Sequence, residues 1–206
     1  MNILVWNVRG LNHPLKQNEV ASRIRKLNIS LVCLLETRVK FHKMQGIVGK
    51  MFPGWSIFHN YEYARNGRIW MIWRDVVKVS LISTSDQSIT SMIEYDTKKF
   101  ILSGIYGCNE GVDRKKLWRH LESIYNEGYT EPWMLAGDYN VIATAEESCP
   151  FNANFGINAD MRDFVEVRRY ILVYDHAFTG TMFTWTNKHQ DGFIARKLDR
   201  VLINEA

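Results

Sequence analysis

The fold is decided by the stretch WMLAGDYN at residues 133–140, in which a short apolar run ends in Asp138 and Asn140. Apolar runs of this length recur along the whole chain and are typical of strands. They occupy residues 3–6, 31–35, 69–73, 76–82, 100–106, 133–136, 182–185 and 198–203. The run IWMIW at residues 69–73 does not alternate between apolar and polar residues, which is typical of a strand buried on both faces. The chain is therefore predicted to be rich in buried strands.

Three segments between these runs show the apolar repeat of an amphipathic helix. The repeating residues are Val20, Ile24 and Leu27 in 16–28, Leu117, Leu121 and Ile124 in 114–126, and Met161, Phe164 and Val165 after residue 160. Asp113 and Asp160 are the expected N-caps of the second and third helices. Because strands outnumber helices by more than two to one, we expect two packed sheets with helices on their outer faces. A single doubly wound sheet is the less favoured arrangement.

The composition is that of an ordinary globular chain, which we expect to form one domain over residues 1–206. The chain is 46% hydrophobic and 23% charged, and its net charge of +4 is compatible with a nucleic-acid partner without requiring one. Three cysteines without a repeated spacing argue against a disulfide framework or a zinc site. No apolar run approaches the ~20 residues that span a bilayer, and the start MNILVW does not resemble a secretory signal. We therefore expect an intracellular protein with no membrane partner.

Polar side chains follow several of the apolar runs. The acidic and amide residues at these positions are Asn7, Glu36, Asp138, Asn140 and Asp199. Each of them alone most often only forms a turn. Together they form an oxygen-rich set of the kind that α/β enzymes gather at one rim, and such a set suits Mg²⁺, with Mn²⁺ as an alternative. Zinc would need His or Cys, which this pattern lacks.

Six short motifs stand in the order of the endonuclease/exonuclease/phosphatase superfamily. They are WNVRGL at 6–11, LETR at 35–38, IYG at 105–107, GDYN at 137–140, FTWTN at 183–187 and KLDR at 197–200. In detail the sequence resembles the apurinic-type endonuclease domain of plant LINE-type (non-LTR) retrotransposons, from residue 2 to about residue 203. The resemblance implies a four-layered α/β sandwich of the deoxyribonuclease I type, with two packed, mostly antiparallel sheets flanked by helices. It also implies Mg²⁺-dependent phosphodiester hydrolysis that nicks one strand of DNA.

The resemblance further implies a role for each polar residue of these motifs. Glu36 corresponds to the main metal ligand, aided by Asn7. Asp138 corresponds to the carboxylate that orients or deprotonates the attacking water. Asn140 and Tyr106 correspond to residues that hydrogen-bond phosphate oxygens and stabilise charge in the transition state.

The last two motifs imply further site residues and reveal one departure from the family. Thr184 resembles a residue that lines the site, and Asp199 resembles the acid that orients a catalytic His. That His belongs to a Ser-Asp-His motif well after Asp199, and residues 200–206 do not contain it. Asp175-His176 precedes the FTWTN motif, so we interpret it as part of a connector. The sequence therefore predicts a domain that lacks its C-terminal Ser-Asp-His segment and whose activity is impaired.

Basic and aromatic residues alternate in two loops near the predicted rim. We expect Arg9, Arg38, Lys40, Tyr63 and Arg65 to contact nucleic acid, because such residues bind phosphates and stack on bases.

The first interpretation is accordingly a monomeric DNA endonuclease domain without a small-molecule organic cofactor. It would lie in the nucleus where it is functional and elsewhere in the cell otherwise. Two alternatives remain open from the sequence: a catalytically dead nucleic-acid-binding remnant, and a phosphatase of the same superfamily.

Overall fold

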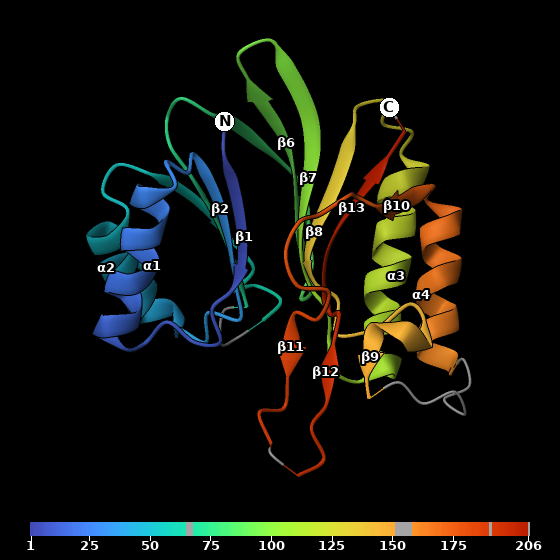
Figure 1. The fold of residues 1–206 in the computed structure, drawn as a ribbon. Helices are drawn as coiled ribbons and strands as arrows, with labels where there is room; N and C mark the ends of the chain where they lie inside the picture. Colours follow the sequence, from blue (N-terminus) through green and yellow to red (C-terminus); the bar gives the residue numbers. More distant parts are fainter. Residues whose placement is uncertain (65–67, 151–157, 190, 206) are drawn as a thin grey trace. The chain divides into compact units, whose positions relative to one another are not determined.

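The computed structural model of the chain describes residues 1–64, 68–150, 158–189 and 191–205 (Figure 1). The chain divides into two compact units, Met1–Tyr106 and Gly107–Ala206. Each unit combines β-strands with two α-helices. Among the described helices, none has the length and apolar character needed to cross a membrane.

The first sheet of unit 1 has the strand order β1-β2-β4-β3. Its strands are β1 (Ile3–Asn7), β2 (Leu31–Leu35), β3 (Ser56–His59) and β4 (Ile69–Trp73). β1 and β2 run parallel, whereas β4 runs antiparallel to both β2 and β3. Every residue of β2 and β4 is buried, which confirms the two buried strands predicted at 31–35 and 69–73. These strands occupy the centre of the sheet, and this explains why their apolar residues do not alternate with polar ones.

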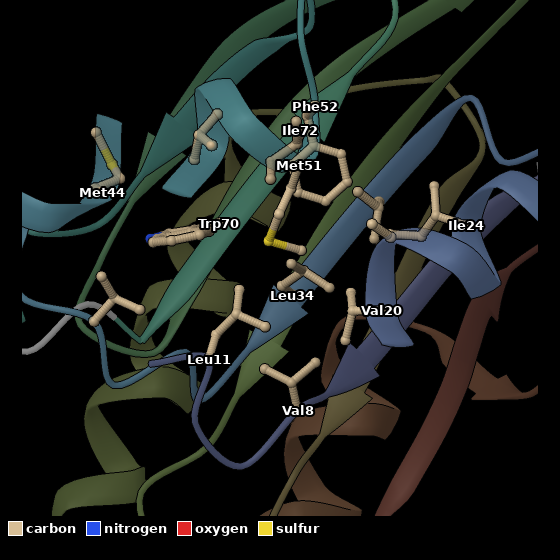
Figure 2. Packing of buried hydrophobic residues seen from close by; sticks show 14 of the residues in the cluster. Val8, Leu11, Val20, Ile24, Leu34, Met44, Met51, Phe52, Trp70 and Ile72 are labelled. Carbon is tan, nitrogen blue, oxygen red and sulfur yellow. The ribbon is translucent and has the colours of Figure 1, made fainter. Parts of the chain in front are cut away.

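Two helices, α1 (Pro14–Lys26) and α2 (Phe41–Met51), cover one face of this sheet (Figure 1). Figure 2 shows the core that they form with the strands; its labelled residues are Val8, Leu11, Val20, Ile24, Leu34, Met44, Met51, Phe52, Trp70 and Ile72. Leu27 was predicted on the apolar face of α1, but it is the C-cap and is 42% exposed. The helix ends one residue earlier, so Leu27 turns away from the core. α2 was not predicted, because Gly46 and Gly49 interrupt its apolar pattern.

The rest of unit 1 is an antiparallel meander of β5 (Lys78–Thr84), β6 (Ser88–Tyr95) and β7 (Lys98–Tyr106). β6 and β7 pack against the first sheet, where a Cβ on Gly104 would lie only 2.9 Å from the Cys33 Sγ. β6 was not predicted, because its buried residues include Ser and Thr. The hydroxyl oxygens of Thr90 and Ser103 lie 2.7 Å apart across the β6–β7 pair, so these two buried hydroxyls are each other's partners.

Unit 2 contains three antiparallel strands in the order β10-β13-β8. They are β8 (Trp133–Asp138), β10 (Val173–Asp175) and β13 (Asp199–Asn204). The helices α3 (Gly111–Asn126) and α4 (Ala159–Tyr170) pack against each other (Figure 1). Between them Trp118 and Phe164 stack with ring centroids 5.4 Å apart. A small sheet joins β11 (Trp185–Thr186), β12 (Ala195–Arg196) and β9 (Ser148–Cys149), which follows a short 3₁₀ helix at Ala145–Glu147.

Several predicted boundaries in unit 2 were wrong. The N-cap of α3 is Glu110 and that of α4 is Asn158, because both helices begin before Asp113 and Asp160. The two aspartates instead lie in the first helical turn, where their charge is favoured by the helix dipole. The strand predicted at 182–185 is reduced to the two residues of β11. In α4, Val167 rather than Val165 is buried with Met161 and Phe164.

Candidate functional site

Asn7 and Glu36 lie next to each other at the carboxyl ends of two parallel strands. Asn7 ends β1 and pairs in register with Leu35, which ends β2, and Glu36 follows directly. The loops beyond these strands remain hydrogen-bonded: Val8 N donates to Leu35 O at 3.0 Å, and Gly10 N donates to Glu36 O at 2.8 Å. Unit 1 therefore brings together the two residues predicted to bind the metal.

The backbone of these loops is held in an unusual conformation. Arg9, Glu36 and Arg38 have φ angles of 49°, 53° and 54°, a region that residues other than glycine seldom adopt. Asn7 Oδ1 accepts a hydrogen bond from Arg9 N at 3.0 Å, and Asn12 Nδ2 donates to Arg38 O at 2.8 Å. Strained residues of this kind persist only where the surrounding structure holds them, and they cluster at functional sites.

The Glu36 carboxylate forms an ion pair with the Arg38 guanidinium. The Glu36 side chain is 12% exposed and that of Arg38 is 66% exposed. A carboxylate and a neighbouring amide suit Mg²⁺, which keeps several of its waters and takes few protein ligands. Within the described parts of the chain, no group of three or more His, Cys, Asp and Glu residues could hold a metal. Glu36 and Asn7 thus fit a weakly held, hydrated cation better than a metal caged by protein ligands.

Tyr106, the last residue of β7, lies in unit 1 beside a cation. Its backbone N–H donates to Gln87 O at 2.9 Å, and the Arg68 guanidinium carbon lies 5.8 Å from the centroid of its ring. Arg68 belongs to the basic and aromatic loop that the sequence indicates for nucleic-acid contact. This arrangement places a positive charge next to the phenol expected to contact phosphate.

The residues predicted to contact nucleic acid are mostly at the surface of unit 1. Arg9, Arg38, Lys40 and Tyr63 are exposed. Arg65 lies outside the described residues. The exposed side chains carry the positive charge that phosphate contacts need.

Asp138 and Asp199 lie opposite each other in unit 2. Asp138 ends β8, Asp199 begins β13, and the two residues pair in the antiparallel register. Asp138 is 5% exposed, and its Oδ1 accepts a hydrogen bond from Asn140 N at 2.9 Å. Asn140 has a φ of 50°, in the left-handed region that asparagine tolerates better than most residues. Unit 2 therefore brings together three of the predicted catalytic residues.

The Asn140 side chain is fixed by a close approach of two backbone segments. Its Nδ2 donates to Gly107 O at 2.7 Å, and Gly107 N donates to Asp138 O at 2.8 Å. A Cβ on Gly107 would lie 2.6 Å from Tyr139 O, so only glycine fits without a shift of the backbone. Tyr139 itself is fully buried, its hydroxyl donates to Leu135 O at 3.1 Å, and burial raises its pKa. Tyr139 therefore anchors the turn as a neutral side chain.

The Thr184 hydroxyl binds the backbone N–H groups of Leu198 and Asp199 at the start of β13. Its Oγ1 accepts hydrogen bonds from Leu198 N at 3.1 Å and from Asp199 N at 3.0 Å. The resemblance implies a residue that lines the site, and in this structure the hydroxyl positions the start of β13. Thr184 thus stands beside Asp199 and contributes by orienting it.

A cluster of paired, mostly buried charges surrounds Arg200, the residue that follows Asp199. We call it the Arg200 cluster, and its members are Glu147, Asp175, Lys197 and Arg200. The fully buried Arg200 side chain pairs with Glu147 and with Asp175, from which its Nη1 lies 3.1 Å away, and Lys197 Nζ lies 3.3 Å from Asp175. The sequence analysis missed this cluster, because Glu147 is 53 residues from Arg200 and stands in no periodic pattern. The only sequence signal was the KLDR motif itself.

The electrostatics of the cluster favour the charged forms of Asp175 and Arg200. Burial alone would raise the pKa of Asp175, but Arg200, Arg168 and Lys197 together hold it below its usual value. Glu147 and Asp175 hold the pKa of Arg200 above its usual value, although burial opposes this.

The Asp175 carboxylate therefore pairs with the cations of the Arg200 cluster, and it does not orient the neighbouring His176. His176 is exposed, and its Nδ1 lies 2.6 Å from Ala177 O. Its backbone N–H donates to Val201 O at 2.8 Å, which continues the pairing of β10 with β13. Asp175 therefore ends a strand and His176 extends its pairing, whereas the sequence had indicated a connector at these residues.

Comparisons with known proteins show what this chain is similar to. A model of the Endonuclease/Exonuclease/phosphatase family matches residues 4–206. The endonuclease domain of TRAS1, a telomere-specific non-LTR retrotransposon, is 12% identical, with a TM-score of 0.74 over 98% of this chain and 84% of that chain. No curated protein matches the sequence.

Two further solved structures are similar. The AP endonuclease LMAP from Leishmania major is 14% identical, with a TM-score of 0.72 over 98% of this chain and 78% of that chain. D. rerio TDP2, solved with a single-strand DNA product, is 17% identical, with a TM-score of 0.70 over 99% of this chain and 83% of that chain. These likenesses confirm the predicted fold class, a mixed α/β fold with two multi-stranded sheets and helices of the deoxyribonuclease I-like type.

Proposed function

Because the chain belongs to the Endonuclease/Exonuclease/phosphatase family, we propose that it hydrolyses DNA phosphodiesters with a divalent cation. We further propose that it acts as the endonuclease domain of a plant LINE-type retrotransposon. The observation that carries the proposal is that Glu36 follows the buried strand β2 and Asp138 ends β8, each in a hydrogen-bonded turn that contains a residue with a positive φ. The fold shared with a non-LTR retrotransposon endonuclease domain supports the finer assignment.

Mg²⁺ is the proposed cation, with Mn²⁺ as an alternative, and Glu36 and Asn7 are the residues that would hold it. When bound, the cation would act as a Lewis acid on a phosphoryl oxygen. The Glu36 carboxylate supplies the negative charge that such an ion needs, and the Asn7 amide supplies a neutral oxygen. The Arg38 guanidinium competes with a cation for Glu36, and once displaced it could pair with a phosphate.

Residues of unit 2 supply the remaining chemistry in this proposal. Asp138 accepts a proton from the attacking water, since Asn140 N–H holds one of its carboxylate oxygens in place. The Asn140 amide carries two hydrogens, of which one goes to Gly107 O and the other can donate to a phosphate oxygen. Asp199, held by the Thr184 hydroxyl, stands opposite Asp138 on the neighbouring strand.

A nicking assay on supercoiled plasmid DNA tests the proposed function. With Mg²⁺ or Mn²⁺ the chain is expected to produce open circles, and EDTA is expected to stop the reaction. DNA binding without nicking would identify a catalytically dead nucleic-acid-binding protein. Release of phosphate from a phosphoinositide, again without nicking, would identify a phosphatase.

The variant Arg38→Ala is expected to bind Mg²⁺ more tightly than the unchanged chain. Removal of the guanidinium leaves Glu36 without the cation that now competes for it. Because the Arg38 guanidinium is exposed, the pair is expected to be worth ~0.2–1 kcal/mol, so the dissociation constant should fall by about 1.4- to 5-fold. Calorimetric titration with Mg²⁺ in the absence of DNA measures the change. Lys50→Ala, which removes an exposed cation from the last turn of α2, is the control. Unchanged or weaker binding by Arg38→Ala would remove Glu36 from the proposed site.

A further inference from the structure

Three aromatic rings of unit 1 meet beside the loop that carries Glu36. They belong to Phe41, His59 and Tyr61, and we call them the aromatic cluster. The ring centroids lie 5.7 Å apart for Phe41–His59, 5.3 Å for Phe41–Tyr61 and 5.2 Å for His59–Tyr61. The corresponding interplanar angles are 74°, 66° and 67°, so these rings meet edge to face. None of the three pairs is a parallel stack that would consume the faces of both rings.

The inner part of the cluster is firmly anchored. Tyr61 donates its hydroxyl hydrogen to Val39 O at 2.8 Å and accepts a hydrogen bond from Trp70 Nε1 at 3.2 Å. Burial raises the pKa of Tyr61 above its usual value, so the phenol stays neutral. His59 belongs to β3 and pairs with Trp70 of β4. Rings that are fixed in this way lose little conformational entropy when a ligand binds.

The outer ring, that of Phe41, is 55% exposed although its helix is fixed to the core. Phe41 begins α2, in which Met44 and Val48 are buried. Lys40 precedes Phe41 and Lys43 follows it by two residues; both are exposed, and the first turn of α2 has no acidic residue. An exposed flat apolar ring in a turn that also carries cations offers a stacking face together with charges that attract phosphates.

The aromatic cluster lies close to Glu36 along the chain. Phe41 follows Glu36 by five residues, so their Cα atoms are at most ~18 Å apart. Successive nucleotides of one strand rise ~3.4 Å in a duplex, so Phe41 lies within the span of about five nucleotides from Glu36. A strand that is cut at Glu36 can therefore place a nearby base on Phe41.

We propose that the aromatic cluster stacks on an unpaired base of the nucleic acid that is cut at Glu36, with Phe41 as the contacting ring. This inference rests on the proposed function and adds to it a substrate class, DNA with a single-stranded or unpaired stretch near the scissile phosphate. Bases inside a duplex already stack on both faces, so only an unpaired base has a face to offer. The adjoining lysines hold the phosphates of the same strand.

The proposal is tested by measuring the binding of labelled oligonucleotides in metal-free buffer, with fluorescence anisotropy as the readout. The probes are a single strand, the same strand in a fully paired duplex, and a duplex with a three-nucleotide bulge. Phe41→Ala is expected to weaken binding of the single strand and the bulged duplex by about 5- to 150-fold, which is the usual cost of losing one stacked base. Binding of the paired duplex should stay unchanged. Phe41→Trp should retain binding, and Phe41→Leu, which keeps an apolar side chain on the fold, should lose it.

Two controls separate stacking from charge and from general surface effects. Lys40→Ala should weaken all three probes alike and lower the salt dependence of binding by about one unit of slope. Tyr170→Ala removes a ring that is 52% exposed on α4 and should change nothing. An equal loss of affinity for paired and unpaired probes with Phe41→Ala, or no loss for either, would overturn the proposal.

Plasmid nicking by the unchanged chain tests the proposed function separately. Nicking with no selective effect of Phe41→Ala defeats the stacking site alone, and selective binding without nicking defeats the hydrolysis alone.

Discussion

Asp138→Asn is expected to lower the rate of plasmid nicking by about 10²–10⁴, or roughly 3–5 kcal/mol of barrier. The amide has the shape of the carboxylate and keeps an oxygen to accept the hydrogen bond from Asn140 N. It cannot take a proton from water, so the chemical step should suffer while the fold remains. Because Asp138 is 5% exposed, no bulk water can easily replace its function.

The rate should be measured under single-turnover conditions with saturating Mg²⁺, so that binding does not obscure the chemical step. Asp113→Asn is the matched control, because it makes the same change at an exposed acid of α3 that pairs with Lys116. Thermal unfolding of both variants checks that the fold persists. If Asp138→Asn nicks as fast as the unchanged chain, Asp138 is not the proton acceptor.

Glu147→Ala is expected to lower the free energy of unfolding by about 3–5 kcal/mol, which is the usual cost of removing one partner of a buried ion pair. Arg200 has a fully buried side chain, so without Glu147 its charge would lose a partner that water cannot replace. Glu147 Oε2 also accepts a hydrogen bond from Ala143 N at 2.6 Å, and that donor would be left buried. Urea unfolding of the full chain measures the loss from the shift of the midpoint at constant slope.

Glu94→Ala provides the matched control for this loss. Glu94 pairs with Lys78 at 2.8 Å, but both side chains are well exposed, so its removal should cost at most ~1 kcal/mol. The double variant Glu147→Leu/Arg200→Met replaces both charges by apolar side chains and should recover much of the stability. A single variant as stable as the unchanged chain would show that the Arg200 cluster does not hold unit 2 together.

The Arg200 cluster should also make stability depend on acid pH. Its cations hold the pKa of Asp175 below the usual value of 3.8. Asp175 therefore contributes stability that is present above this value and is lost as the pH falls through its lower pKa in the folded chain. Asp175→Asn should be less stable than the unchanged chain at neutral pH, and the difference should shrink as the pH is lowered below about 4. Urea midpoints at a series of pH values measure this, and a difference that does not vary with pH would contradict it.

Much of the architecture could be predicted from local patterns. The buried strands at 31–35 and 69–73 were confirmed residue for residue, because continuous apolar runs leave few alternatives. β6 and α2 were missed for a common reason: their apolar patterns are interrupted, by hydroxyl residues in β6 and by glycines in α2. Burial of these elements depends on partners that are distant in sequence, such as Ser103 for Thr90.

For the candidate site, too, some features follow from the sequence and others only from folding. The sequence by itself determined which acids and amides end the strands, because a strand that leaves the core must end in residues that water can solvate. It could not determine how each acid is engaged. The local turns decided that Glu36 pairs with Arg38 and that Asp138 is held by Asn140, each two residues further along the chain. Only the tertiary structure decided that Asp175 pairs with buried cations. The physical reason is that a carboxylate acquires its role from the charges and donors that folding brings within a few ångströms. The two carboxylates that pair with Arg200 belong to residues 25 and 53 positions away in the chain.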